Sequence, residues 1–332
     1  MLIGLDAMGT NLSPCPEVEG AITALKASSE DLHIVLFGEK ASIESELEKY
    51  ELPWPTERLS IIHASERVLV EDSPAKVLRQ KPNSSIALGF KMQKSGELDA
   101  FVSAGSTGAV MAAALLTLRP LKGVDRPCIG TVVPTARGPL LLLDAGANVD
   151  CKSHQLTQFA GLGKVYAQDL MGIESPRIGL LNIGEEPEKG DEVSLAAHKA
   201  LSCSHLNFVG NIEGGAILDG ACDVLVCDGF VGNVILKFYE SVADFITNLF
   251  REKLGKAAGS EDFGEIFRIL DYTETGGAPL LGVNGVVVIC HGGSPPKAIH
   301  NAIGVATKAV ESAMVSHFLE EIDSFGAIGT DS

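Results

Sequence analysis

The sequence predicts an α/β fold with a largely parallel sheet and helices on both of its faces, a three-layer α/β/α arrangement. Apolar runs of strand length alternate with helical patterns, and most of these runs end in Gly beside a polar residue and lead into a helix. This repetition is typical of βα units. With 332 residues, 45% of them hydrophobic and 21% charged, the chain can bury a large core. We expect one domain over residues 1–325, followed by a C-terminal tail at 326–332.

The N-terminal part supplies the first expected elements in chain order. MLIGLD and HIVLFGE are predicted strands, followed by helices near 17–26 and 43–49. LSIIHA leads into a predicted helix at 73–79, with Ser73 as its N-cap and proline at the first helical position. DAFVSA continues through a Gly-rich turn into an Ala-rich helix at 109–118.

A Pro/Gly-marked stretch at 123–139 is expected to be a connection that joins two lobes or lines the mouth of a cleft. The strands expected after it are GPLLLLDAGA, RIGLLNIG, LNFVGNIEG, CDVLVCDG and GVVVICHGG. Residues 234–270 indicate a helical hairpin, because apolar residues recur at helical spacing around a charged, small-residue tip. We expect the hairpin to pack against the core or a sister subunit, with contact to a membrane as the alternative.

The formal net charge of −17 argues against general affinity for nucleic acid or anionic lipid, because both need a basic surface. An anionic substrate must therefore be held by a few local cations. The seven cysteines show no metal-binding spacing, and several lie in apolar runs, which favours free buried thiols in a reducing compartment. MLIGLDAMG lacks the basic region of a signal peptide. We expect a cytoplasmic protein without a metal or cofactor.

Seven polar turns follow the predicted strands: DAMGTN, SAGSTGA, DAGANVD, NIGEEPEKG, GNIEGG, DGFVGN and HGGSPPK. Ligands of open α/β sheets bind beyond the carboxyl ends of the strands, where helix N-termini present free N–H groups. The turns therefore predict a site, although ordinary connecting loops remain the alternative. The polar side chains that we expect to contact substrate are Asp6, Asp144, Asp150, Asn182, Glu185, Asn211 and Asp228.

Cations are sparse in these turns, and the familiar phosphate-loop, zinc-protease and serine-hydrolase motifs are missing. SAGSTGAV lacks the third glycine of a dinucleotide-binding turn. Lys189 and Lys237 suit phosphate, although each could be a solvated lysine near a helix start. Asn148 and Asn233 suit a cap or an oxyanion donor, and His291 suits either a strand-end hydrogen bond or acid–base chemistry.

Eight ordered blocks resemble the bacterial phosphate acyltransferase family, PlsX. They are DSPAKVLR, SAGSTGAVMAAAL, DRPCIGTVVPT, LLLDAGANVDCK, GLLNIGEE, NFVGNIEG, CDGFVGNVILK and GGAPLLGVNGVVVICHG. The resemblance implies a fold similar to isocitrate/isopropylmalate dehydrogenases and phosphotransacetylases, usually dimeric. It also implies transfer of a fatty acyl group from acyl-[acyl carrier protein] to inorganic phosphate, giving acyl-phosphate for phospholipid synthesis. The family usually opens DAMGGDHAP and has an HGSS-type turn, where this chain has DAMGTNLSP and HGGSPPK.

In that reaction phosphate is the nucleophile, so the enzyme must hold phosphate beside a thioester and stabilise an oxyanion. We assign Lys237, Asn233, His291 and Asn148 to the chemistry. The residues assigned to phosphate are Ser103, Gly105, Ser106, Thr107, Gly108, Lys189, Gly229 and Gly232. The residues assigned to docking of the acidic carrier protein are Arg119, Lys122, Arg126 and Arg137.

Other functions remain open on sequence grounds. A phosphotransacetylase-like enzyme that uses acyl-coenzyme A would share both phosphate and thioester. A non-catalytic paralogue that binds an acyl carrier or scaffolds other lipid enzymes would account for the altered DAMGTNLSP and HGGSPPK turns. A nicotinamide dehydrogenase is the remaining alternative. Peripheral contact with the inner face of the membrane, through the hairpin, is a further expectation.

Overall fold

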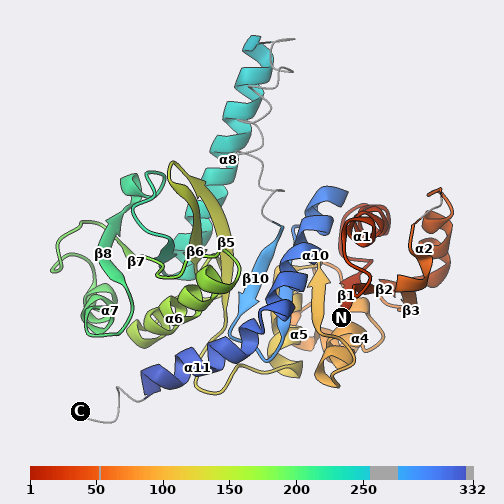
Figure 1. Cartoon of the computed structure of the whole chain (residues 1–332), viewed down its shortest axis with the longest axis horizontal. Helices are drawn as coiled ribbons and strands as arrows, with labels where there is room; N and C mark the ends of the chain where they lie inside the picture. The colour runs from red at the N-terminus through yellow and green to blue at the C-terminus, as the bar shows by residue number, and fades with distance from the viewer. Residues whose placement is uncertain (52–53, 255–275, 327–332) are drawn as a thin grey trace. The chain divides into compact units, whose positions relative to one another are not determined.

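The computed structural model of the chain describes residues 1–51, 54–254 and 276–326 (Figure 1). The chain divides into two compact units. Unit 1 comprises Met1–Pro127 and Thr275–Glu320, and unit 2 comprises Cys128–Glu274 and Glu321–Ser332. Each unit contains its own group of paired strands. The prediction that the whole chain forms one domain over 1–325 stays a prediction.

In unit 1 the strands follow the order β3-β2-β1-β4-β11-β10. Their bounds are Leu2–Asp6 for β1, His33–Gly38 for β2, Leu59–His63 for β3, Ala100–Ser103 for β4, Ala278–Leu281 for β10 and Val286–Ile289 for β11. Neighbours pair in parallel except β10, which is antiparallel to β11. In register, Asp6 lies opposite Ser103, and Ser103 lies opposite Ile289. The carboxyl ends of β1, β4 and β11 therefore meet at one edge.

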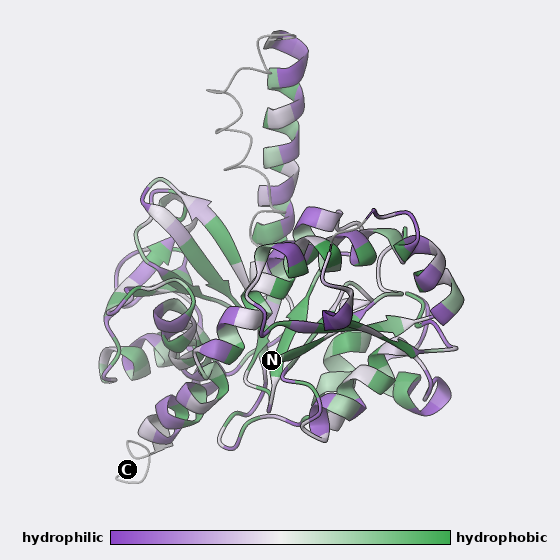
Figure 2. Ribbon diagram, turned by 45° about the vertical axis from the view of Figure 1, so that its right-hand side comes forward, coloured by the Kyte–Doolittle hydropathy of each residue, from purple (hydrophilic) through white to green (hydrophobic). Residues whose placement is uncertain are grey.

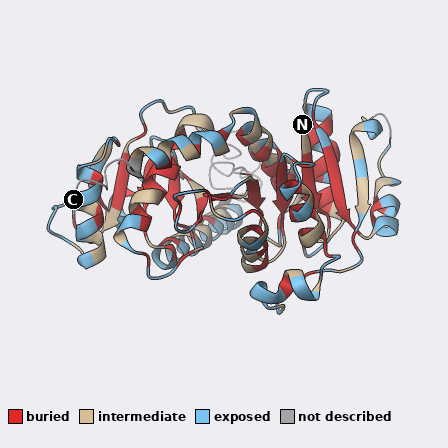
Figure 3. Ribbon diagram, turned by 90° about the horizontal axis from the view of Figure 1, so that it is seen from below, coloured by how far each residue is buried: buried red, intermediate tan, exposed pale blue. Residues whose placement is uncertain are grey.

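The helices of unit 1 pack in two groups. They are α1 at Cys15–Ala27, α2 at Lys40–Leu47, α3 at Val77–Gln80, α4 at Ser85–Lys94, α5 at Thr107–Thr117 and α10 at Pro296–Glu311. α1 packs on α10, which contacts β4 and β11, whereas α4 packs on α5 and contacts β1 and β2. Figure 3 shows buried strands between helices that are buried on one side only. This is the expected layered arrangement.

In unit 2 the strands follow the order β5-β6-β9-β7-β8. Their bounds are Cys128–Thr135 for β5, Gly138–Leu143 for β6, Ile178–Asn182 for β7, Phe208–Glu213 for β8 and Val224–Val226 for β9. β5 and β6 form an antiparallel hairpin, and the remaining pairs are parallel. The helices are α6 at Ser153–Asp169, α7 at Glu192–Ser202 and α8 at Gly229–Leu254, while α11 at Met314–Gly326 contains the division between the units.

The predicted class, a largely parallel α/β fold, is confirmed, and three local predictions change. The expected connection at 123–139 contains the strand β5, because its Pro134 lies opposite Pro139 near the hairpin turn, where lost ladder bonds cost least. The expected helix at 73–79 is a 3₁₀ turn followed by the short α3, and the Ser73 side chain makes no capping hydrogen bond. Of the expected hairpin at 234–270, α8 supplies residues up to 254, and the rest lies outside the described residues.

α8 is amphipathic over its whole length, as Figure 2 shows. Among the described residues, no helix is long and apolar enough to span a membrane. All seven cysteines are free, and five of them are buried as predicted, whereas Cys15 is half-buried and Cys203 is exposed.

Candidate active site

The carboxyl edge of unit 1 is organised by one buried carboxylate. Asp6 ends β1 with 1% of its surface exposed. It accepts hydrogen bonds from Ser103 Oγ at 2.6 Å and from the Met8 N–H at 3.1 Å. Burial raises the pKa of Asp6, and these hydrogen bonds oppose that rise. Ser103 Oγ in turn accepts from the Gly105 N–H at 3.1 Å. Asp6 and Ser103 thus hold the two turns, DAMG and SAGSTG, rather than pointing at a ligand.

The SAGSTG turn leads into the N-terminus of α5. Ser106 stands at the N-cap position, but its side chain makes no capping hydrogen bond. The first N–H groups of a helix have no partner within the helix. The predicted residues Thr107 and Gly108 belong to this first turn, and Thr107 is exposed. The turn can therefore present backbone N–H groups to an anion.

His291 follows β11 and is exposed at the same edge. Its Nδ1 accepts a hydrogen bond from the Gly293 N–H at 3.1 Å, so a neutral ring carries its proton on Nε2. The Asn11 N–H donates to the Gly292 carbonyl oxygen at 2.8 Å. The two turns that depart from the family pattern, DAMGTN and HGGSPP, are therefore in contact with each other.

Two side chains near this edge are not predicted from the sequence. Arg67 lines a cavity of about 90 Å³ beside the DAMGTN turn, and its Nη2 donates to the Thr10 carbonyl oxygen at 2.6 Å. Glu17 is fully buried and accepts from the Thr10 N–H at 2.9 Å and from Ser13 Oγ at 2.5 Å. A signal for Glu17 existed, since it stands in the first turn of the helix that follows DAMGTN.

The carboxyl edge of unit 2 is also organised by one buried carboxylate. Asp144 follows β6, is fully buried, and accepts five N–H donors at 2.7–3.2 Å. Three of these donors are the backbone groups of Gly146, Ala147 and Asn148 in the DAGAN turn, and a fourth is Asn148 Nδ2. Burial raises the pKa of Asp144 while the donors oppose that rise. Asn148 is itself buried, so the structure ties it to the turn.

The opening of α8 packs directly on that turn. A Cβ at Gly229 would lie 2.6 Å from Asp144 Oδ2, and one at Gly232 would lie 1.9 Å from the Asp144 carbonyl oxygen. These two predicted phosphate-binding glycines therefore have a packing role. Asp228 caps the helix, because its Oδ1 accepts from the Phe230 N–H at 2.7 Å, and its Oδ2 accepts from the Cys151 N–H at 2.8 Å.

Asn233 does not cap α8, contrary to the sequence interpretation, since the helix already begins at Gly229. Asn233 is exposed, and its side chain lies against the DAGAN turn, 3.3 Å from the Cβ position of Gly146. Lys237 does not open the helix either; it stands two turns inside, exposed, with Nζ 2.7 Å from Glu240 Oε2. Residues four apart share one helix face, so Asn233 and Lys237 are neighbours.

Two of the residues predicted to contact substrate hold the loop after β7 through hydrogen bonds to its backbone. Asn182 Nδ2 donates to the Lys189 carbonyl oxygen at 3.0 Å, and Asn211 Nδ2 donates to the Glu186 carbonyl oxygen at 2.8 Å. Asn182 and Asn211 therefore hold the loop. Lys189 and Glu185 are exposed on it. Because β6, β9, β7 and β8 are parallel neighbours, this loop lies at the same edge of the strands as Asp144 and Asp228.

The remaining predicted residues are exposed. Asp150 follows the DAGAN turn with a positive φ of 58°. Arg119, Lys122 and Arg126 lie on the segment between α5 and β5, in unit 1. Arg137 lies in the β5–β6 turn of unit 2.

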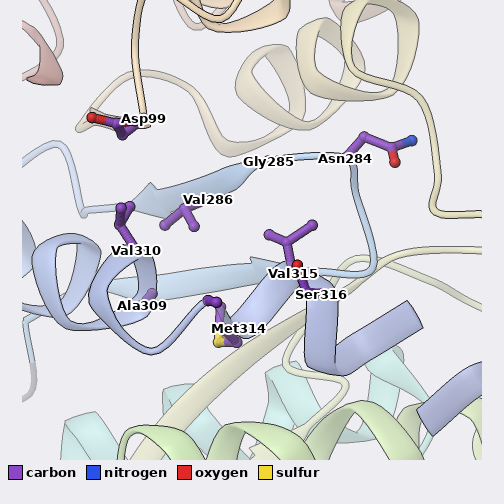
Figure 4. A pocket seen from close by; sticks show the side chains of 10 residues that line it. Asp99, Asn284, Gly285, Val286, Ala309, Val310, Met314, Val315 and Ser316 are labelled. Carbon is purple, nitrogen blue, oxygen red and sulfur yellow. The ribbon is translucent and has the colours of Figure 1, made fainter. Parts of the chain in front are cut away.

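Two further features carry little chemistry. Burial raises the pKa of the Cys151 and Cys290 thiols to about 12, so neither suits a nucleophile. A cavity of about 330 Å³ in unit 1 is lined by residues that include Asp99, Asn284 and Ser316 (Figure 4). Asp99 precedes β4 and Asn284 precedes β11, so this cavity lies at the amino ends of the strands, away from the polar turns.

Known proteins share this architecture. A phosphotransacetylase from Streptococcus pyogenes superposes with a TM-score of 0.62 at 17% identity over 94% of each chain. A branched-chain phosphotransacylase from Enterococcus faecalis gives a TM-score of 0.58 at 15% identity, covering 93% of this chain and 99% of its own. At these identities the likeness concerns the fold alone. The chain thus has the α/β fold of phosphotransacetylases.

Sequence relatives are more specific. The model of the family described as "Fatty acid synthesis protein" matches residues 1–317. The phosphate acyltransferase of Desulforamulus reducens is 46% identical over 97% of both chains, and that of Thermoanaerobacter pseudethanolicus is 44% identical over 98% of both chains. The chain belongs to this family of phosphate acyltransferases.

Proposed function

We propose that the chain transfers a fatty acyl group from acyl-[acyl carrier protein] to inorganic phosphate. The observation that supports this most strongly is the 46% identity to a phosphate acyltransferase over 97% of both chains. The geometry agrees with it. Each unit has a buried aspartate that holds a polar turn open at the carboxyl edge of parallel strands, where anionic ligands of α/β folds bind.

The proposed reaction needs no protein nucleophile. A phosphate oxygen attacks the thioester carbonyl carbon, a C–O bond forms, and the carbonyl electrons move onto oxygen. The tetrahedral oxyanion then collapses, the C–S bond breaks, and the thiolate leaves with the electron pair and takes up a proton. The protein must hold phosphate, stabilise the oxyanion and supply that proton.

Particular residues suit these tasks. His291 carries its proton on Nε2 when neutral, since Nδ1 accepts from Gly293, so we assign it to the oxyanion or to the leaving thiolate. Asn233 and Lys237 share the exposed face of α8, and we assign them to phosphate and oxyanion. Lys189 and the N–H groups of Ser106, Thr107 and Gly108 are further proposed phosphate contacts. We assign Asn148 to positioning, because its amide bonds Asp144.

Partner interactions belong to the same proposal. The acyl carrier would dock on Arg119, Lys122, Arg126 and Arg137. A homodimer and peripheral membrane contact at the inner face are supported by the exposed apolar side chains of α8, among them Phe230, Val234 and Phe245, at 63%, 53% and 66% exposure. Both remain proposals.

The test is release of free carrier from palmitoyl-[acyl carrier protein] by the purified protein, with and without inorganic phosphate, with acyl-phosphate detected by phosphorus NMR. Phosphate-dependent release with acyl-phosphate as product is the expected result. Folded protein that releases no carrier would contradict the proposal. A parallel reaction with palmitoyl-coenzyme A identifies the preferred acyl donor. Faster turnover with palmitoyl-coenzyme A would show that coenzyme A, and not the carrier protein, is the donor.

A further inference from the structure

Lys189 is the single cation in the acid-rich loop between β7 and α7. Residues 185–192, EEPEKGDE, contain five acidic side chains and this one lysine. A lysine among so many carboxylates is expected to pair with one of them, because opposite charges at about 4 Å attract each other. In the described part of the chain, however, the Lys189 ammonium forms no ion pair. Its charge is therefore available to an anionic ligand.

The backbone of Lys189 is held on both sides by amide side chains from two neighbouring strands. Asn182 is the last residue of β7, and Asn211 lies in β8, which pairs with β7 in parallel (Figure 1). The Lys189 carbonyl oxygen accepts from Asn182 Nδ2 at 3.0 Å. The Lys189 N–H donates to the Glu186 carbonyl oxygen at 3.1 Å, and the same oxygen accepts from Asn211 Nδ2 at 2.8 Å. The two amides thus fix the peptide groups before and after the Lys189 Cα.

Two glycines let the loop pack closely around this lysine. A Cβ at Gly184 would lie 2.9 Å from Lys189 Cγ and 3.4 Å from its Cδ, so the stem of the lysine lies against Gly184. Gly190 has a φ of 103°, and a Cβ there would lie 2.7 Å from Asn182 Oδ1. The loop therefore fixes the backbone and the first carbons of the Lys189 side chain.

The two asparagines use their amides within the protein. Asn211 is 5% exposed and its Nδ2 bonds the loop, while Asn182 accepts from the Ile183 N–H at 2.8 Å and donates to Lys189. We infer that Asn182 and Asn211 are positioning residues that hold Lys189 where it binds the phosphate substrate. The inference rests on the proposed role of Lys189 in acyl transfer to phosphate. The competing explanation is that both asparagines only stabilise the loop.

Phosphate binding by alanine variants tests the inference. Asn182→Ala and Asn211→Ala each remove one of the two hydrogen bonds, so isothermal titration calorimetry with inorganic phosphate should give a Kd about three- to tenfold higher than that of wild type. The KM for phosphate should rise by the same factor, while the KM for the acyl donor stays unchanged. Variants on two different strands keep the test informative if one of them fails to fold.

Asn207→Ala is the matched control. Asn207 directly precedes β8, and its Nδ2 also donates to a backbone carbonyl oxygen, that of Ser175, at 3.2 Å. It lies at the amino end of β8, whereas Lys189 follows the carboxyl end of β7. Asn207→Ala should lower the stability to urea, as Asn182→Ala does, but should bind phosphate like wild type. If Asn182→Ala and Asn211→Ala also bind phosphate like wild type, both asparagines only stabilise the loop and the inference is wrong.

A double-mutant cycle shows whether Asn211 acts through Lys189. Lys189→Ala should raise the Kd for phosphate by about tenfold or more, because it removes a charged donor. Adding Asn211→Ala to Lys189→Ala should then change the Kd by less than about twofold, since the side chain that Asn211 positions is gone. An undiminished effect of Asn211→Ala in that background would overturn the inference, and so would a Lys189→Ala variant that binds phosphate like wild type.

Binding and turnover together distinguish this inference from the proposed function. If wild type and the variants bind phosphate in the expected pattern but wild type forms no acyl-phosphate, the proposed function fails and the positioning role stands. If wild type forms acyl-phosphate and the asparagine variants keep its Kd and KM for phosphate, the inference fails and the proposed function stands. A wild type that neither binds phosphate nor shows phosphate-dependent turnover would overturn both.

Discussion

Asp6 and Asp144 show how single buried carboxylates shape the two polar edges. Asp6 is the last residue of β1 and Asp144 directly follows β6. Each is at most 1% exposed and accepts hydrogen bonds from the turn that follows it. A buried carboxylate is costly unless donors surround it, and here the backbone N–H groups of the turns are those donors. The carboxylates hold the turns, and more exposed side chains such as Asn233 and Lys237 are left for ligands.

Lys237 provides the first residue-scale prediction. Lys237→Ala removes a charged hydrogen-bond donor from the face of α8 that carries Asn233, and we expect the KM for phosphate to rise by about tenfold or more. Steady-state kinetics with phosphate as the varied substrate measures this. Lys253→Ala, near the other end of the same helix, is the matched control and should leave that KM unchanged. An unaltered KM in Lys237→Ala would remove Lys237 from the proposed phosphate site.

Glu17 provides a prediction about pH. Burial raises its pKa above the ordinary 4.5, and its Oε2 has no hydrogen-bond partner in the described part of the chain. The folded chain therefore keeps the Glu17 proton at pH values where the unfolded chain has lost it. The stability linked to this proton is fully present below about pH 4.5 and is lost as the pH rises through the folded-state pKa.

Glu17→Gln removes this titration while keeping an oxygen for the Thr10 N–H. We expect the free energy of unfolding of wild type, relative to Glu17→Gln, to decrease from about pH 4 to about pH 8. Urea titrations at several pH values measure the difference. Glu19→Gln, exposed on the same helix, reports the effect of removing a surface charge. A difference that does not change with pH would show that Glu17 does not titrate in this way.

At the scale of elements, α8 is the segment on which most proposed functions converge. Its first turn lies against the DAGAN turn, and its next turns line an apolar cavity of about 160 Å³ beside β5 and β6. Several of its apolar side chains are exposed. Glycines at its start permit the close approach, since any Cβ there would overlap Asp144.

Gly232→Ala tests that contact. Alanine favours a helix interior by about 1 kcal/mol over glycine, but the new Cβ would lie 1.9 Å from the Asp144 carbonyl oxygen. We expect a net loss of about 2 kcal/mol or more of unfolding free energy. Gly304→Ala in α10, where a Cβ meets open space, should instead raise it by about 0.5–1 kcal/mol. Thermal and urea unfolding measure both, and a neutral Gly232→Ala would show that α8 can shift at no cost.

At the scale of the whole molecule, the net charge of −17 repels anionic partners. Phosphate and an acidic carrier protein must both approach against this field, so local cations decide where they bind. Lys122 and Arg126 are exposed cations on the segment between α5 and β5.

The double variant Lys122→Glu, Arg126→Glu tests carrier docking. We expect the KM for palmitoyl-[acyl carrier protein] to rise by about tenfold and the KM for palmitoyl-pantetheine to stay unchanged, because only the carrier contacts these cations. Raising the salt concentration from about 50 mM to about 200 mM should shrink the difference between wild type and variant. The double variant Lys26→Glu, Lys91→Glu makes the same change of net charge at exposed positions in the last turns of α1 and α4, and it is the control. Equal KM values for the carrier substrate would place docking elsewhere.

The sequence by itself determined the α/β class, the positions of most strands and the polar turns at their carboxyl ends. These features follow from hydrophobic periodicity and turn chemistry, which are local. It also singled out Asp6, Asp144 and Asp228 as substrate contacts at strand ends, which stays a prediction; in the structure their side chains accept hydrogen bonds from the neighbouring turns and from the start of α8. The strand β5 was not predicted, because Pro134 and the surrounding glycines are typical of a loop. Asn233 was predicted at the start of a helix, but α8 begins four residues earlier, at Gly229.

Only the tertiary structure decided which polar residues serve the fold. The start of α8 depends on Gly229 and Gly232 fitting against Asp144, a contact between segments about 85 residues apart in sequence. Asn182 and Asn211 bind the backbone of one loop, and Glu17 reaches back to Thr10, which spacing alone does not reveal. The apolar cavity arises from α8, β5, β6 and the segment after β8 together. Such close approaches depend on side-chain volume and buried hydrogen bonds between distant segments, and these exist only once the chain has folded.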